Sequence, residues 1–416
     1  MVAFAGGFGR PFARYWLSGF AADFGDGVRL AAFPLLAAQL TRSPVAVAAV
    51  TAVQGLPWLL AGAGLGVIVD RADRRRLMII VDIARAVIIA ALAAAVLAHG
   101  AGLVLIYLTA FTTGAGSALR DTAALTCVPR LVEPADLDRA NGRVIAGQIV
   151  GNELAGPAAG GWLFGLAAVL PFAVSAGTLG IAVLLLLTLP SVFQPVPAGP
   201  ARQDPVSSLA ALRHELGEGA RWLWRHPGIR DVTIAAAVLS AMDSAWIAVL
   251  VLYVIQILHL KPGAYGLLLA VAALGGIAAG GLGPRLTRRL GPWRSLLLAG
   301  LVMAVTQAVL GLTASVITAA VMLFASSAAW ALFNLTVVTM RQRQVPAALL
   351  GRVTSLYGTA WRGSEVLGAI GGGTLAATAG IRAPMLAGAI PIAAVITLLA
   401  WRHRTLAAGT ARLDDT

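Results

Sequence analysis

The stretch GVIVDRADRRR at positions 66–76 places a dense basic group between two long apolar segments. The apolar segment at 45–69 contains no charged residue, and the one at 77–98 contains only Asp82 and Arg85. Each segment is about as long as the ~20 residues that a helix needs to cross a ~30 Å hydrocarbon layer. A short arginine-rich loop between two such segments is typical of the cytoplasmic side of a membrane protein.

The composition of the whole chain agrees with this interpretation. Hydrophobic residues make up 59% of the 416 positions and charged residues only 12%, whereas soluble domains carry roughly 25% charged residues. The net charge of +13 does not indicate nucleic-acid binding, because the basic residues lie in alternate loops. The single cysteine, Cys127, excludes an internal disulfide, and we expect the first apolar segment to be an uncleaved anchor.

Twelve apolar segments are predicted to cross the membrane as helices, which makes this an all-α membrane protein. They are residues 13–40, 45–69, 77–98, 102–127, 140–165, 168–190, 229–258, 263–283, 293–312, 315–340, 352–378 and 383–403. If the N-terminus is cytoplasmic, the outside loops hold only Arg42, Lys261 and Arg382, and most other arginines lie inside. The positive-inside rule therefore predicts two cytoplasmic termini in an inner (plasma) membrane protein.

The sequence divides at a region that interrupts the pattern of spans. We predict a six-helix bundle over 1–190, a cytoplasmic linker over 191–228, a second bundle over 229–405 and a tail over 406–416. The linker begins with a proline-rich part, and apolar residues then recur at helical spacing from Leu209 to Leu223. This spacing predicts an amphipathic helix along the cytoplasmic face, with Ser207 or Ser208 as its N-cap.

The two halves repeat each other at an almost constant offset. GNELAGPAAGG at 151–161 matches GSEVLGAIGGG at 363–373 with an offset of 212, and the loop at 66–75 matches 280–289 with an offset of 214. Repeats of this kind predict two pseudo-symmetric six-helix bundles with a cleft between them at mid-membrane.

The loop at 66–76 resembles the signature G-x-x-x-D-R-x-G-R-R of the major facilitator superfamily, with Asp73 in place of the usual glycine. The stretch Gly156, Pro157, Gly160 and Gly161 resembles the core of that family's antiporter motif, although Asn152 stands where a glycine is expected. Residues 218–227 and 120–124 resemble the branch of enterobactin exporters and macrolide efflux proteins. The resemblance implies a twelve-helix transporter in which the signature-loop residues latch one state of the alternating cleft. Those residues are Gly66, Asp70, Arg71, Arg74 and Arg75.

Ionisable residues inside spans are the strongest candidates for function, because each costs about 2.5–3.5 kcal/mol at the centre of the bilayer. The candidates for proton coupling are Asp26, Glu153, Glu365, Asp243 and Asp23. The candidates for ion pairs within the membrane are Arg29, Asp82, Arg85, Arg120, Asp121 and Arg362. A structural hydrogen bond, or a pair with Arg120 or Arg362, is the alternative role for the two glutamates. Trp246, Trp361 and Tyr357 are candidates for an apolar pocket, with packing or lipid contact as the alternative.

We therefore expect a secondary transporter that exports an amphipathic or hydrophobic small molecule by proton antiport, working as a monomer. The sequence contains no Walker loop, catalytic triad or metal-ligand cluster, so we expect no enzymatic activity, cofactor or metal. Uptake of a nutrient by symport, or a membrane sensor on the same scaffold, is the alternative. Polar substrates usually require more cationic and amide groups within the spans than this sequence has.

Overall fold

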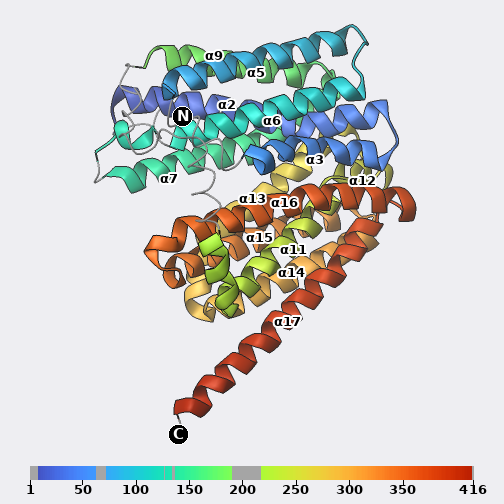
Figure 1. The fold of residues 1–416 in the computed structure, drawn as a ribbon. Coiled ribbons are helices and arrows are strands. Elements are labelled where there is room, and N and C mark those ends of the chain that lie inside the picture. Colours follow the sequence, from blue (N-terminus) through green and yellow to red (C-terminus); the bar gives the residue numbers. More distant parts are fainter. Residues whose placement is uncertain (1–7, 62–71, 126, 134–135, 190–216, 415–416) are drawn as a thin grey trace. The chain divides into compact units, whose positions relative to one another are not determined.

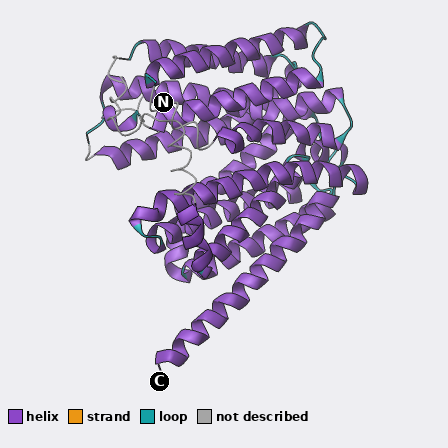
Figure 2. Cartoon of the chain, viewed as in Figure 1, coloured by secondary structure: helices purple, strands orange, loops and turns teal. Residues whose placement is uncertain are grey.

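The structure is a computed structural model that describes residues 8–61, 72–125, 127–133, 136–189 and 217–414. Within these ranges the chain forms helices joined by short loops and contains no strand (Figure 2). Helices are the secondary structure in which a membrane-crossing segment satisfies its own backbone hydrogen bonds. The prediction of an all-α protein is confirmed.

The helices of the first half follow the predicted spans closely (Figure 1). They are α2 (Gly9–Leu40), α3 (Pro44–Ala61), α5 (Arg74–Leu97), α6 (Leu103–Leu125), η1 (Val128–Arg130), α7 (Leu137–Gln148), η3 (Ile149–Ala155), α8 (Gly156–Leu166) and α9 (Leu170–Leu187). The short η1 is a 3-10 helix. The predicted fifth span, 140–165, is therefore a composite of α7, the π-helical η3 and α8.

The second half begins with a helix over residues 217–225. The others are α11 (Pro227–Ile247), α12 (Leu250–Gln256), α13 (Pro262–Leu290), α14 (Pro292–Leu312), α15 (Val316–Gln344), α16 (Ala347–Ala379) and α17 (Ala383–Asp414). Eight helices of the described residues are long and apolar enough to cross a membrane. The helices α2 and α16 are also long, but α2 carries Asp23, Asp26 and Arg29 in mid-helix and α16 carries Arg362 and Glu365.

The chain forms two compact units. The first unit contains residues 1–199 together with 251–270, and the second contains 200–250 together with 271–416. The segment 251–270 joins the first unit because α13 begins against α8. A side chain on Gly161 would lie 2.6 Å from the backbone nitrogen of Gly266, so the two helices approach closely through glycines. Periodicity in the sequence does not report such a contact.

The repeated glycines make the same kind of contact in each unit. In the first unit, a Cβ atom on Gly156 would lie 2.7 Å from the Cα atom of Gly27 in α2, and one on Gly160 would lie 2.3 Å from the carbonyl oxygen of Val28 in the same helix. In the second unit, the equivalent Gly368 and Gly372 would place Cβ atoms 2.1 and 2.0 Å from carbonyl oxygens of α11. Small residues let membrane helices approach to backbone contact. The repeat in the sequence therefore corresponds to a repeated helix–helix contact.

The linker helix packs on the second unit. Glu218 forms an ion pair with Arg352 of α16, and Gly219 lies against the backbone and Cβ of the same arginine. Trp222 packs against the hydrophobic core of the second unit and stacks on His226. The predicted start of the helix near Leu209 and its N-cap at Ser207 or Ser208 lie outside the described residues.

Candidate functional site

A network of charged side chains lies inside the first unit, where α2, α5 and α6 meet. Asp26 of α2 accepts hydrogen bonds from Arg29 on the same helix and from Arg85 of α5. It also accepts one from the Ser117 hydroxyl of α6, at 2.9 Å. The spacing of three residues between Asp26 and Arg29 places both on one face of α2. The structure brings the two residues of this predicted pair together and adds two partners from other helices.

A second carboxylate extends the network along α5. Asp82 accepts from Arg85 Nη1 at 3.3 Å and from Arg120 Nε at 2.9 Å. Arg120 Nη2 also donates to the backbone carbonyl of Ser18 at 3.2 Å. Arg120 therefore pairs with Asp82 of another helix, not with its sequence neighbour Asp121. Buried charges are tolerated in an apolar interior when they are paired and hydrogen-bonded in this way.

Access to this network is uneven. The side chains of Asp82, Arg29 and Arg85 are at most 2% exposed, whereas that of Asp26 is 19% exposed. Asp26 is thus the most exposed carboxylate of the network. Arg29 Nη1 and Arg85 Nε are buried and have no hydrogen-bond partner among the described residues. The network combines a buried, fully paired end at Asp82 with a more accessible end at Asp26.

Three other acidic residues of the first unit form no ion pair within the described parts of the chain. Asp23 and Asp121 lie within electrostatic range of each other and of Arg120. Glu153 is exposed and lies in the π-helical η3, which packs against α2. Single π-helical turns inside α-helices are rare and occur often at functional sites. Among the described residues, the carboxyl group of Glu153 therefore has no arginine partner, whereas those of Asp26 and Asp82 do.

In the second unit, the predicted acidic residues differ from each other in the same way. Glu365 forms an ion pair with Arg362 at 3.1 Å, one helical turn away on α16. Asp243 of α11 accepts a hydrogen bond from Trp246 Nε1 at 3.1 Å, and no cationic partner for it is present among the described residues. Trp246 is buried beside Asp243, while Tyr357 and Trp361 contact each other edge to face on α16. Among the described residues, the Trp246 ring makes no ring contact with Tyr357 or Trp361.

The signature loop is only partly visible. Gly66, Asp70 and Arg71 lie outside the described residues. Arg75 donates from Nε and Nη2 to the carbonyls of Leu186 and Leu187, at 2.8 and 2.7 Å. These carbonyls lie at the end of α9, and that of Leu186 also accepts a hydrogen bond from the backbone N–H of Leu189 at 3.1 Å. The arginine adds two hydrogen bonds there, and its positive charge interacts favourably with the negative end of the helix dipole.

Asp73, which replaces the usual glycine of the signature, has a role of its own. Its carboxylate accepts a hydrogen bond from the backbone N–H of Arg76 at 3.0 Å and caps the N-terminus of α5. Side-chain caps of this kind stabilise a helix by about 1 kcal/mol. The arrangement Asp-Arg-Arg-Arg before an apolar run could have indicated it from sequence.

Sequence reasoning missed the hydroxyl groups of the network. Ser117 binds Asp26, and Ser175 of α9 accepts a hydrogen bond from Arg29 Nε at 3.1 Å. Serine is common in membrane helices, so neither position stands out by composition. Ser117 does lie three residues before Arg120, on the same face of α6. That spacing is the one signal that could have found it.

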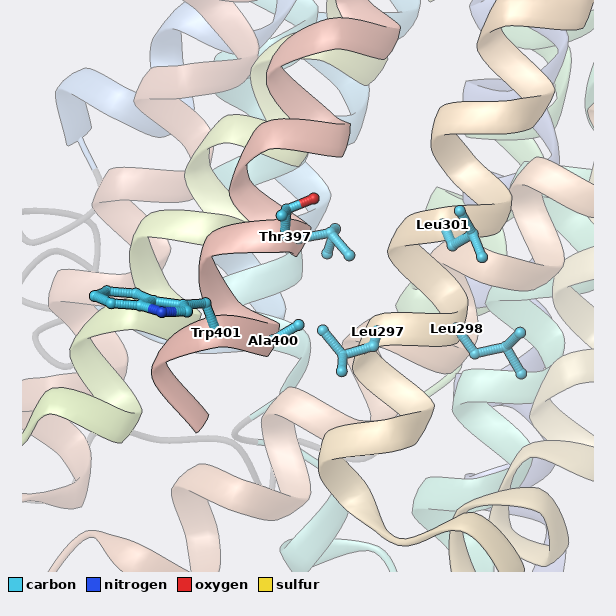
Figure 3. Close-up of a pocket in the computed structure, with 7 residues that line it drawn as sticks. Leu297, Leu298, Leu301, Thr397, Ala400 and Trp401 are labelled. Carbon is cyan, nitrogen blue, oxygen red and sulfur yellow. The ribbon is translucent and has the colours of Figure 1, made fainter. Parts of the chain in front are cut away.

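A groove between α14 and α17 is lined by uncharged residues, unlike the network of the first unit. It encloses about 520 Å³, and Figure 3 shows that its labelled residues come from these two helices. The lining residues are Leu297, Leu298, Leu301, Ile396, Thr397, Ala400 and Trp401. None of them is charged, so the groove offers no group for proton exchange. No cluster of three His, Cys, Asp or Glu that could hold a metal occurs among the described residues.

Known proteins match this chain over most of its length. The sequence profile of the Major Facilitator Superfamily matches residues 15–369. The chain is 27% identical over 383 residues to the "Multidrug efflux pump Tap" of Mycolicibacterium fortuitum, which covers 89% of this chain and 90% of that protein. It is 28% identical over 336 residues to the "Enterobactin exporter EntS" of Citrobacter koseri (strain ATCC BAA-895 / CDC 4225-83 / SGSC4696), covering 78% and 74%.

Solved structures show the same fold at low sequence identity. The nucleoside transporter NupG superposes with a TM-score of 0.75 at 14% identity, over 94% of this chain and 98% of that one. A bacterial homologue of the iron transporter ferroportin, in an inward-facing state, gives a TM-score of 0.73 at 16% identity, with 94% and 98% covered. The fold is therefore the twelve-helix, two-bundle fold that the repeats predict. With the profile match across most of the chain, this protein belongs to the major facilitator superfamily of membrane transporters.

Proposed function

We propose that this chain exports an amphipathic or hydrophobic small molecule across the plasma membrane in exchange for protons. Two relatives named as an efflux pump and an exporter, matched over 89% and 78% of this chain, support the direction of transport. The low content of charged residues inside the spans favours a substrate that partitions into lipid. We further propose that both termini are cytoplasmic, that the plasma membrane is the location, and that the monomer is the working unit.

The observation that carries the proton assignment is the division of the carboxyl groups into paired and unpaired ones. Asp26, Asp82 and Glu365 each have an arginine partner. Glu153 and Asp243 have none among the described residues. Unlike Asp23 and Asp121, they also have no arginine within electrostatic range there, and an uncompensated charge inside a membrane is costly. A carboxyl group in that position can reduce the cost by binding a proton and can release it when water reaches it. We propose Glu153 and Asp243 as the proton carriers, one in each half.

The charge network around Asp26 then has a different role. Two arginines and a serine hold this carboxylate and join α2, α5 and α6. We propose that the network keeps these helices together as one body while the protein alternates between states. We also propose that a bound solute acts on this network through Asp26, because Asp26 is the most exposed carboxylate of the network. In this proposal Asp23 and Asp121 supply further negative charge near Arg120.

Transport into lipid vesicles tests the proton assignment. Purified protein in vesicles is given an imposed pH gradient, and the movement of N-phenyl-1-naphthylamine, a neutral amphipathic dye, is followed by fluorescence. We expect the gradient to accelerate dye movement by the unchanged protein. Glu153→Gln and Asp243→Asn should each lose this acceleration and keep downhill movement of the dye, because an amide cannot carry the proton.

Glu133→Gln is the matched control, since Glu133 is an exposed carboxylate in the loop after η1. It should respond to the gradient like the unchanged protein. If both Glu153→Gln and Asp243→Asn keep full acceleration, the proton assignment is wrong. If the unchanged protein moves the dye at a rate that does not depend on the gradient, proton antiport of this dye is wrong.

A further inference from the structure

Aromatic side chains of α15 and α16 form a continuous row inside the second unit. The ring centroids of Trp330 and Trp361 are 5.8 Å apart, and those of Trp361 and Tyr357 are 6.0 Å apart. Both pairs meet edge to face, a favourable geometry for aromatic rings. Tyr357 is buried, whereas Trp330 and Trp361 are half-buried. The row therefore has a buried end at Tyr357. Arg362 lies over the Trp361 ring at 5.5 Å and Phe333 stacks on Trp330 at 6.2 Å, so a ligand can contact only the remaining exposed part of each indole.

An arginine without a counter-charge completes the buried end of the row. The guanidinium carbon of Arg341 lies 3.9 Å from the centroid of the Tyr357 ring, and the residue is 7% exposed. Its Nη1 is buried and has no hydrogen-bond partner among the described residues. Cation–π contact stabilises a guanidinium, but it does not replace a hydrogen-bond acceptor. A buried arginine normally has an acidic partner, and here the described residues do not provide one.

A second donor in the same row is also unsatisfied. The indole Nε1 of Trp361 is buried and has no acceptor within the described ranges. The nearest acidic residue along α16 is Glu365, which forms an ion pair with Arg362 at 3.1 Å. The row therefore combines aromatic surface with two buried N–H groups, one of them cationic, that lack acceptors. A ligand that complements this row would carry an anionic oxygen on a flat apolar group.

We propose that Arg341, Tyr357, Trp361 and Trp330 form a binding subsite for an aromatic group that carries an anionic oxygen, such as an aromatic carboxylate. The ligand ring lies against the free indole surface of Trp361 and Trp330. Its anionic oxygen accepts hydrogen bonds from Arg341 and from Trp361 Nε1. This inference rests on the proposed export function and names the chemical class of the exported molecule.

Equilibrium binding tests the subsite without any proton gradient. The full-length protein in phosphatidylcholine nanodiscs is titrated with 2-naphthoate and with 2-naphthamide, its neutral counterpart, by calorimetry. The unchanged protein should bind the anion more tightly. Arg341→Gln should weaken 2-naphthoate binding at least about tenfold, the ratio typical of one hydrogen bond to a charged group. Binding of 2-naphthamide should change much less.

Trp361→Phe separates the indole N–H from the ring. It keeps an aromatic surface and removes the second donor, so we expect it to weaken 2-naphthoate binding by a smaller factor than Arg341→Gln. Arg343→Gln is the matched control, because Arg343 is exposed and lies two residues along the same helix. It removes the same charge near the same level of the membrane and should leave the 2-naphthoate affinity unchanged.

Three outcomes would overturn the subsite. The first is equal binding of 2-naphthoate by the unchanged protein and Arg341→Gln. The second is equal weakening by Arg343→Gln, which would indicate a general effect of surface charge. The third is loss of 2-naphthoate binding when phosphatidylglycerol replaces part of the phosphatidylcholine, which would identify a lipid headgroup as the occupant of Arg341. Because binding is measured without a gradient, none of these results depends on the proton carriers.

Discussion

Asp82 carries a carboxylate in the interior of the first unit, with 0% of its side chain exposed. Arg85 and Arg120 both donate to it, at 3.3 and 2.9 Å. Removing one partner of a buried charge pair costs about 3–5 kcal/mol, because the other charge remains buried without compensation. We predict that Asp82→Asn lowers the thermal midpoint of the detergent-solubilised protein markedly, as measured by loss of the monodisperse peak after heating.

The network offers its own comparison for this prediction. The double variant Asp82→Asn with Arg120→Gln should recover part of the lost stability, since it removes the uncompensated arginine as well. Arg76→Gln breaks an ion pair with Asp73 whose arginine side chain is 83% exposed, and such pairs contribute little. An Asp82→Asn protein as stable as Arg76→Gln would mean that Asp82 does not stabilise the helices.

At the scale of the helix, stability depends on glycines that face a neighbouring backbone. A Cβ atom on Gly372 would lie 2.0 Å from the carbonyl oxygen of Ala245, whereas one on Gly371 would meet no atom within 4 Å. Backbone cannot rotate away as a side chain can, so α16 must move from α11. Overpacking of this kind typically costs about 1–3 kcal/mol. We predict that Gly372→Ala lowers the thermal midpoint and that the adjacent Gly371→Ala does not.

The repeat extends this prediction to the first unit. A Cβ atom on Gly160 would lie 2.3 Å from the carbonyl oxygen of Val28, so Gly160→Ala should lower the thermal midpoint as Gly372→Ala does. Gly177 of α9, which has open space at the Cβ position, is the control in this unit. Equal midpoints for Gly160→Ala and Gly177→Ala would show that α8 and α2 adapt to the added methyl group.

At the scale of the whole molecule, the distribution of charge predicts which loops face the cytoplasm. Cys127 is buried, so we expect it to react little with thiol reagents, and single cysteines can be introduced elsewhere and labelled. Cysteines at the exposed positions Arg42 and Lys261 should react with a membrane-impermeant thiol reagent on intact cells. Cysteines at the exposed positions Arg76 and Arg288 should react after the membrane is permeabilised.

This labelling tests the duplicated architecture as well as the orientation. Arg76 and Arg288 belong to the two basic stretches that repeat in the sequence. They lie in the first turn of α5 and the last turn of α13, so they should behave alike. Reaction of one from outside and the other from inside would contradict the twelve-span topology. If all four cysteines react from the side opposite to the one expected, the fold stands and the orientation in the membrane is reversed.

The sequence by itself determined the helical class, the positions of most spans and the local pairs. Hydrophobic length decides where a helix crosses the membrane, and a spacing of three residues decides which side chains on one helix can meet. For that reason the sequence indicated the pairs of Asp26 with Arg29, Asp82 with Arg85, and Arg362 with Glu365, and the structure brings each pair together. The close helix contacts at the repeated glycines were predictable too, because glycines four residues apart lie on one face of a helix.

Only the tertiary structure decided which charges are compensated by other helices. Arg85 reaches Asp26 across 59 positions of sequence, and Arg120 reaches Asp82 across 38. These contacts separate the paired carboxylates from Glu153 and Asp243. The same is true of Arg341 over Tyr357, whose residues lie on different helices. Helix periodicity describes one helix at a time, whereas the rotation and packing of several helices determine which faces meet.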